Sequence, residues 1–446
     1  MPASMYFMQK YAFQAELWLL RVFLFCLPFQ LRFIFASWSP HVQIGVGAPV
    51  DFGFNEWTAG FIYGTDVIFL ALLVLWMLRT RAHQKTKSRS FESIILVLFA
   101  GTAAWSFVAA QDIGIAVFRY LKLAEGIMLF WYIRNAIHYF GRIELLRPLI
   151  AVLLVQAGLS IVQIGLQHNA GAWFLGEGAF VPGGHSVAAF RVGAELFLRA
   201  YGTFQHPNVL AFFAFIVLNL TQAYYIFSPE KISKRMQVLF GVSTVSALWV
   251  IGLTFSRSVM LLVIGMRVVL FLLAWFLHHQ ERGRRVVDVL VISLSTIAVF
   301  SFLYWPQVSA RKNFDVQEEA YQERISYNSA AGKTAGSHKF TGVGMGHFVY
   351  DQMKKRPYLD RYYYQPAHNI FLLIAAEMGY LALAFFALFL GYVWLYRSAI
   401  IWRTDKTFAL WRFMFLGAII SLGCIDHYQW TLHQGLLLFF IVLAII

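Results

Sequence analysis

Long apolar stretches recur along this chain and limit it to one kind of fold. A helix crosses the roughly 30 Å of membrane hydrocarbon with about 20 mostly apolar residues. Because 59% of the 446 residues are hydrophobic and only 13% are charged, the chain lacks the polar surface that a soluble globule needs. We therefore predict an all-α, polytopic membrane protein with about 12 transmembrane helices. The candidate spans lie near residues 17–36, 61–78, 91–110, 114–133, 148–167, 206–227, 238–254, 258–277, 286–304, 369–396, 408–425 and 432–446.

Lys and Arg residues gather in the short loops of one face, which is the pattern of cytoplasmic loops. The opposite short loops, 37–60, 111–113 and 426–431, contain none. Both termini are therefore predicted to be cytoplasmic. The net charge of +14 reflects this topology, which removes the argument for binding to nucleic acid. The basic short loops, which together hold 17 Lys and Arg residues, are 79–90, 134–147, 228–237, 278–285 and 397–406.

Two longer segments, 168–205 and 305–368, fall on the outer face of this topology. Long loops are exempt from the charge rule, so their basic residues do not contradict the orientation. Loops of this length are usually functional or disordered. We predict a single integral membrane domain over residues 1–446, in which the loop 305–368 between helices 9 and 10 forms a small external lid. An amphipathic helix is expected near 314–328.

Three arginines, Arg199, Arg257 and Arg324, share the outer face with His368. An arginine at the membrane boundary is costly unless it is solvated, paired or bound to an anion. As an alternative, Arg257 could extend to lipid headgroups from a turn between two helices. His368 and Asn369 could serve only as the cap of the tenth helix. The cluster therefore predicts either an anion-binding site with a titratable histidine or a set of ordinary interfacial residues.

Two further features lie close to His368 in the sequence. Glu377 follows nine residues later, roughly 13 Å deeper along the expected helix. A buried carboxylate there is either functional or the partner of a buried arginine. The glycine run at 342–346 follows no strand and lacks the GxGxxG spacing, so we expect a tight turn rather than a nucleotide-binding loop.

The sequence gives no support for a metal site or another cofactor. No HExxH or DxD motif occurs, and no Cys/His pattern has metal-ligand spacing. Both cysteines, Cys26 and Cys424, lie in apolar stretches, so no disulfide framework is expected. Asp51 and Glu56 in the first outer loop are the remaining candidates for metal ligands.

The outer-face motifs occur in a fixed order along the chain. That order is GTFxHPNxxA (202–211), TxSR (254–257), ER (323–324) leading to TGVGMGHF (341–348), and HNxFLxxxxExGY (368–380). In order, spacing and external placement this set resembles the O-antigen ligase and polymerase superfamily of bacterial envelope glycosyltransferases. The resemblance covers about residues 195–440.

This resemblance implies a glycosyltransferase that moves a glycan from an undecaprenyl-diphosphate carrier to an acceptor hydroxyl at the periplasmic face of the bacterial inner membrane. The implied partners are the lipid-linked donor, a lipid A core or glycan acceptor, and the lipid bilayer. It also implies that no metal or other cofactor is needed and that the loop 305–368 contains part of the active site. The implied catalytic residues are His368 as the base and Arg257 and Arg324 on the diphosphate; the implied substrate-binding residues are Arg199, His206, Asn208, Asn369 and Glu377.

The chemistry of these residue types agrees with such a reaction. Displacing a lipid diphosphate from the sugar carbon C1 places negative charge on the leaving group. Arginine presents a rigid fork of donors to phosphate oxygens and stays charged at all relevant pH values. The acceptor hydroxyl needs a proton acceptor, and an ordinary histidine titrates in the right range.

The identity of the acceptor stays open at this point. The ligase pattern of His, then Asn, nine residues, Gly and two more residues is met through Gly379, but Ala382 departs from it. A ligase, a polysaccharide polymerase and a protein O-oligosaccharyltransferase are therefore alternatives, with the ligase slightly favoured. The non-enzymatic alternative is a transporter of lipid-linked glycans, although transporters tend to show internal repeats and broken helices near the membrane midplane.

The predicted topology can be tested by labelling single introduced cysteines from either side of the membrane. Positions 85, 232, 283 and 404 should react only from the cytoplasm, because they lie in the basic short loops. Positions 185, 330 and 428 should react only from outside. Cytoplasmic labelling at position 330 would contradict the prediction, since Arg324 and His368 would then face the wrong compartment.

Overall fold

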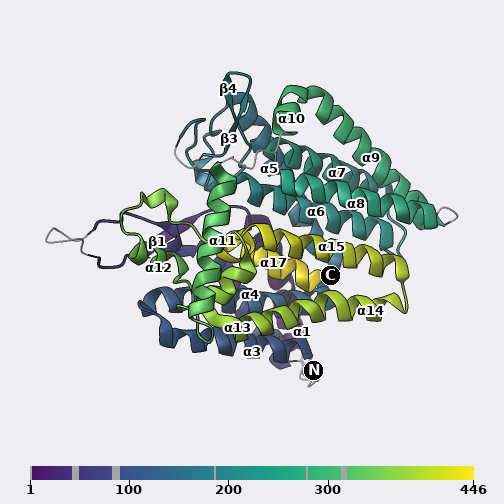
Figure 1. Ribbon diagram of the computed structural model, residues 1–446. Helices are drawn as coiled ribbons and strands as arrows, with labels where there is room; N and C mark the ends of the chain where they lie inside the picture. Colours follow the sequence, from purple (N-terminus) through teal and green to yellow (C-terminus); the bar gives the residue numbers. More distant parts are fainter. Residues whose placement is uncertain (1–2, 43–49, 83–90, 185–186, 278–279, 313–318) are drawn as a thin grey trace.

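The computed structural model describes residues 3–42, 50–82, 91–184, 187–277, 280–312 and 319–446 (Figure 1). Each predicted apolar stretch overlaps one helix, and β-structure within these residues is limited to two two-stranded sheets, so the all-α fold class is confirmed. The long helices are α1 (Ala3–Cys26), α2 (Gly64–Ala82), α3 (Phe91–Trp105), α4 (Ile113–Phe140), α5 (Arg142–Leu166), α6 (Pro207–Phe227), α7 (Lys234–Thr254), α8 (Arg257–Phe276), α9 (Glu281–Leu303), α13 (Ile370–Gly391), α15 (Lys406–Ile425) and α17 (His433–Ile445).

Eight helices in the described part of the chain are long and apolar enough to cross a membrane. They include α13, which continues through a π-helical turn (Tyr392–Tyr396) into α14 (Arg397–Trp402). α17 is apolar but has only 13 residues, and α4 carries several charged residues in its first half. The chain is thus a multi-spanning membrane protein, while the total of twelve spans stays a prediction.

The first predicted span, 17–36, is wrong in its second half. α1 ends at Cys26, and residues 32–37 form strand β1 (Arg32–Ser37) instead of helix. Pro28 explains the difference, because proline disfavours helical backbone at the residue before it and lacks an N–H. β1 then pairs antiparallel with β2 (Ala59–Tyr63).

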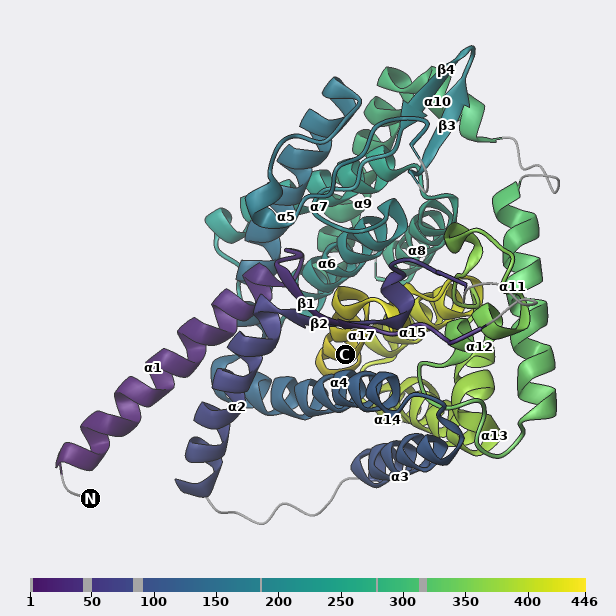
Figure 2. The same ribbon diagram turned by 90° about the vertical axis from the view of Figure 1, so that its left-hand side faces the viewer.

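Shorter elements lie across one end of the helices. In Figure 1, α11 (Glu319–Ser337) stands nearly perpendicular to α13, with α12 (Phe348–Lys355) beside it, and Figure 2 turns this side toward the viewer. α10 (Trp305–Lys312) contacts the hairpin of β3 (Ala189–Val192) and β4 (Glu195–Leu198). A helix is therefore present in the long loop, but it starts at Glu319; residues 313–318 lie outside the described residues.

The core is centred on α6, which is buried along nearly its whole length. α6 packs against α5, α7, α8 and α9 on one side and contacts α17 on the other. α17 lies mainly against α4, so its side chains are also buried. This packing brings the ends of α6, α8 and α15 together at the side that α11 covers (Figure 1).

Helix α13 is broken, and a loop of the long external segment closes the break. Gly379 has φ 82° and ψ 173°, which interrupts the helix. The carbonyl of Ala376 instead accepts a hydrogen bond from Val343 N (2.9 Å), and the carbonyl of Glu377 accepts one from Gly344 N (3.0 Å). Unpaired peptide groups at membrane depth are costly, so these two bonds stabilise the break. The glycine run is therefore a set of tight turns, as predicted, that fits against α13.

We expect Gly342→Ala to destabilise this junction. Gly342 has φ +61°, and a Cβ there would lie 2.2 Å from the carbonyl carbon of Glu377. The backbone strain alone costs about 1–3 kcal/mol. Gly332→Ala is the control, because Gly332 lies inside α11 with open space around it, and alanine favours a helix interior by about 1 kcal/mol. Thermal unfolding in detergent should show a lower midpoint for Gly342→Ala only; equal midpoints would contradict the role of the loop.

Candidate active site

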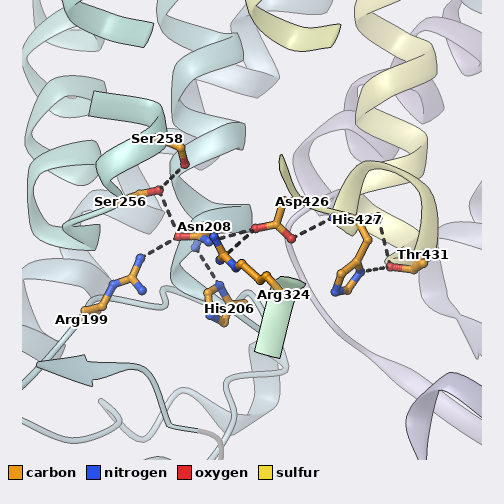
Figure 3. A network of polar contacts seen from close by, with 9 residues as sticks. All are labelled: Arg199, His206, Asn208, Ser256, Ser258, Arg324, Asp426, His427 and Thr431. Atoms are coloured by element: carbon orange, nitrogen blue, oxygen red, sulfur yellow. Dashed lines mark hydrogen bonds and ion pairs between the residues drawn. The ribbon is translucent and has the colours of Figure 1, made fainter. Parts of the chain in front are cut away.

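A network of polar side chains surrounds Asp426, the residue directly after α15 (Figure 3). One carboxylate oxygen, Oδ2, accepts a hydrogen bond from Asn208 Nδ2 at 3.1 Å and lies 3.7 Å from Arg324 Nη2. The other, Oδ1, accepts from the backbone N–H of His427 at 2.9 Å. Asp426 therefore joins the start of α6, the long-loop helix α11 and the end of α15.

Asn208 connects this carboxylate to the turn between α7 and α8. Its amide oxygen accepts from Arg199 Nη2 (2.7 Å) and from Ser256 Oγ (3.0 Å). Arg199 is buried and also donates from Nε to the carbonyl of Thr254 at 2.7 Å. His206 is the N-cap of α6, where its Nδ1 accepts from Asn208 N at 3.1 Å. These contacts fix Asn208 between the arginine and the carboxylate.

The turn that carries Arg257 has a strained backbone. Phe255 adopts a left-handed conformation (φ 46°), which is uncommon for a residue with a large side chain. Its ring is fully buried and packs against Phe190 (ring centroids 5.0 Å apart) and Phe300 (6.0 Å). This packing holds the turn, so that Arg257 becomes the first residue of α8. The N-terminus of a helix attracts anions, and the positive charge of Arg257 adds to this attraction.

His368 lies beside Asp426 and His427. The rings of the two histidines are 4.8 Å apart and nearly perpendicular, and His368 stacks on Tyr327 of α11 at 5.9 Å. The His368 Nδ1 is buried and has no hydrogen-bond partner in the part of the chain that the structure describes. The Nδ1 of His427, by contrast, lies 2.6 Å from Thr431 Oγ1. Among His206, His368 and His427, His368 is therefore the one whose Nδ1 makes no hydrogen bond that fixes it to a described residue.

Burial and neighbouring charges set the protonation states here. Burial alone would raise the pKa of Asp426, but the guanidinium of Arg324, and the imidazole of His368 in the acidic range where it is protonated, bring it well below its ordinary value. Burial lowers the pKa of His368 below 6.5, Arg324 lowers it further, and Asp426 opposes both effects. At neutral pH the aspartate is thus ionised and the histidine is neutral, which leaves the imidazole able to accept a proton.

Burial also shifts the pKa values of the other titratable groups of the site toward their neutral forms. Burial is the main cause that lowers the pKa of both His206 and His427 to about 3, so both are neutral. Burial and then Arg311 lower the pKa of Arg199 to about 9, which keeps its guanidinium charged at pH 7. Three arginines against one carboxylate give the site a positive charge that suits a diphosphate.

The structure brings Arg199, Arg324, His206, Asn208 and His368 together as the sequence predicted. Two other residues that the resemblance marked as substrate-binding make hydrogen bonds within the protein, and their contact with substrate stays a prediction. Asn369 caps α13, because its side-chain oxygen accepts from the N–H groups of residues 371 and 372. Glu377, two residues before the break in α13, accepts from the N–H of residue 348 at 3.3 Å.

Sequence reasoning left Asp426 and His427 out of the site. Both are buried and central to the network. The available signal was an aspartate and a histidine placed directly after an apolar stretch on the outer face. That position is where a titratable side chain meets the external loops.

The cluster also has the spacing of a metal site. Ligand atoms of His368, Asp426 and His427 lie within 4.8 Å of one another, so these three side chains could hold an ion. Arg324 already faces the carboxylate, and nearby arginines repel a further cation. Of the two outer-loop candidates, Asp51 accepts from the N–H of Gly53 at 2.8 Å, and Glu56 lies 3.7 Å from Arg32.

Fold and cluster together define a multi-spanning membrane protein with a basic, histidine-containing site at one end of its helices. Residues 242–387 match the family model described as O-antigen ligase, which confirms the superfamily that the motifs predicted. The matched stretch contains Arg257, Arg324 and His368, whereas Asn208 and Asp426 lie outside it. No curated protein matches the chain. The family match supports a glycosyltransferase of the ligase or polymerase type, with a lipid-linked glycan and an acceptor as its partners.

The pKa of His368 gives a prediction for the pH dependence of transfer. A base must be neutral, so the rate should rise with pH through a midpoint below 6.5 and then stay level. Arg324 lowers this pKa, so Arg324→Gln should move the midpoint to higher pH. The measurement is single-turnover transfer at saturating donor between about pH 4 and 8. A native midpoint above 6.5, or one that Arg324→Gln leaves unmoved, would contradict the assignment.

Proposed function

We propose that this protein transfers a glycan from an undecaprenyl-diphosphate carrier to a hydroxyl of lipid A core, in the manner of an O-antigen ligase, at the periplasmic face of the inner membrane. The observation that carries the proposal is the convergence of Arg324 and the neutral His368 on Asp426, with Arg199 joined to the same carboxylate through Asn208 and Arg257 close enough to act on the charge of Arg199. Such a site neutralises a diphosphate and offers a base within one cluster. The family match supports the same class of reaction.

The transfer is a displacement at the sugar carbon C1. The acceptor oxygen forms a bond to C1 while the bond from C1 to the diphosphate oxygen breaks. The electron pair of that bond leaves with the undecaprenyl diphosphate, and the acceptor proton moves to His368. Arg257, Arg324 and the N-terminus of α8 bind the diphosphate and stabilise the charge that it gains. This step needs no redox partner.

Asp426 and Asn208 are positioning residues in this proposal. Asp426 orients Arg324 and stabilises His368 once the histidine has taken up the proton, because an opposite charge within a few ångströms favours the charged form. Asn208 holds Arg199 and Ser256 on one side and Asp426 on the other. Arg199 is fixed by these contacts and adds positive charge to the site.

A polymerase or a protein O-oligosaccharyltransferase would use the same donor chemistry with a different acceptor. The departure from the ligase pattern at Ala382 does not decide between them, because this residue is fully buried within α13. The acceptor is therefore decided by assay. Purified protein in detergent is supplied with the lipid-linked glycan and, in turn, with lipid A core or a free glycan chain. Product on lipid A core supports the ligase reaction, and product on the glycan alone contradicts it.

The division of roles is tested with variants in excess EDTA, where we expect native transfer to persist. Arg257→Ala and Arg324→Ala should weaken donor binding as well as transfer, and Lys at either position should restore it only partly, because a point charge lacks the bidentate fork. His368→Ala should lower the transfer rate by about 100-fold or more while donor affinity stays nearly unchanged. Arg284→Ala is the matched control, since Arg284 is exposed in a predicted cytoplasmic loop.

Three outcomes would contradict these roles. Full activity of His368→Asn would show that the histidine is not the base. Unchanged donor binding in both arginine variants would remove the diphosphate assignment. Loss of transfer in EDTA with recovery on adding Mg²⁺ or Mn²⁺ would assign an ion to the His368, Asp426 and His427 cluster.

A further inference from the structure

We propose that a cavity beside the catalytic cluster, lined by aromatic residues, binds a neutral sugar ring of the acceptor. This inference rests on the proposed function, because it assigns the second substrate of the same reaction. The cavity lies between β2, α4, α13 and the start of α17. Its lining includes Trp57 and Thr431, which both contact His427: the rings of Trp57 and His427 are 5.1 Å apart, and Thr431 Oγ1 lies 2.6 Å from His427 Nδ1.

The cavity lies on the opposite side of the cluster from most of the arginine network. Figure 3 shows Arg199 and Ser256 at one end, Asp426 in the middle, and His427 with Thr431 at the other end. A single displacement at C1 requires the acceptor to approach opposite the leaving diphosphate. If the diphosphate binds at the arginine end, the acceptor must come from the end of His427. The cavity adjoins that end.

The lining has the character of a sugar-binding pocket. Tyr63, Phe118 and Trp430 present aromatic surface to the cavity, on which the C–H face of a pyranose ring can pack. Two buried polar atoms of its lining make no hydrogen bond among the described residues: Gln205 Oε1, and Arg32 Nη1, whose ion pair with Glu56 is beyond hydrogen-bond distance at 3.7 Å. Buried polar atoms normally have partners. A sugar hydroxyl can donate to the first and accept from the second.

The charges of the cavity are paired within the protein, which selects against a charged ligand. Lys122 contacts Asp66 and lies 3.4 Å from Glu125. Arg32 lies 3.7 Å from Glu56. A phosphorylated or acidic sugar would have to break these pairs or remain unpaired in a buried place, and both are costly. A neutral sugar avoids this cost.

The third basic residue of the cavity lining, Arg119, also has partners within the protein. It donates to the backbone carbonyls of Trp57 (2.7 Å) and Thr431 (3.2 Å), and Glu377 is close enough to act on its charge. Arg119 therefore shapes the wall that the cavity shares with the catalytic cluster. This arrangement also explains Glu377, which the sequence marked as either functional or the partner of a buried arginine.

The first test is steady-state transfer from undecaprenyl-diphosphate glycan to lipid A core in native protein and Phe118→Leu. The variant keeps the site apolar but removes the aromatic face, so the KM for the acceptor should rise by about 3- to 10-fold, while the donor KM and kcat should stay within about 2-fold. Phe174→Leu, an exposed position in the external segment, is the matched control and should behave as native. A rise in the donor KM alone would place the donor sugar in the cavity, and unchanged KM values would show that no substrate binds there.

The second test addresses charge. Phosphorylating the terminal sugar of the acceptor should lower kcat/KM of the native protein by about 10-fold or more, because the added charge finds no free partner. Glu56→Gln releases Arg32 from its carboxylate and should recover part of this loss. Equal use of both acceptors by the native protein would overturn the assignment to a neutral sugar.

Binding of the acceptor without donor separates failure of this inference from failure of the proposed function. Trp57 and Trp430 line the cavity, so the neutral acceptor should change the tryptophan fluorescence of native protein and do so more weakly in Phe118→Leu. This binding change without any glycan transfer would support the cavity assignment and contradict the proposed function. If glycan transfer occurs but the fluorescence change is the same in native protein and Phe118→Leu, the proposed function would stand. The assignment of the cavity as an acceptor site would then be contradicted.

Discussion

The ionised carboxylate of Asp426 is the interaction on which the site depends. A buried charge is tolerated only when opposite charge and hydrogen bonds surround it, and here Arg324, Asn208 and the N–H of His427 do so. These partners come from the long loop, from α6 and from the segment after α15, so one negative charge aligns three distant parts of the chain. It also leaves the nearby arginines in excess, and this excess is the basis of the proposed binding of a diphosphate.

The positions of the membrane segments could be predicted because each long apolar stretch carries its own signal. The errors in the predicted elements occur where the sequence pattern is weaker. Pro28 ended the first helix early, and strands of four to six residues, such as β1 and β3, are too short to show a pattern. Eight helices satisfy the length and apolarity of a span among the described residues, and α4, whose first half carries charged residues, is not one of them, so the total of twelve stays a prediction.

The candidate site could be predicted in part. Arg324 and His368 were identified because polar groups on one face of a membrane protein can meet only there, and the structure places both next to Asp426. The link between Asn208 and Asp426 could not be predicted, since it joins residues 218 positions apart without any local pattern. Asn369 was predicted to bind substrate. An asparagine directly before a helix is equally consistent with an N-cap, and the side chain of Asn369 makes the hydrogen bonds of an N-cap.

The break in α13 has a consequence for how substrates reach the site. Because the loop at 342–346 supplies the hydrogen bonds that the interrupted helix lacks, lifting it would strand two carbonyl groups in an apolar environment, at a cost of several kcal/mol for each. This part of the external segment is therefore a fixed wall rather than a lid that opens. A carrier with a long hydrocarbon tail would therefore have to enter laterally from the bilayer, between helices. Its polar headgroup would bind beneath this loop, which keeps its position.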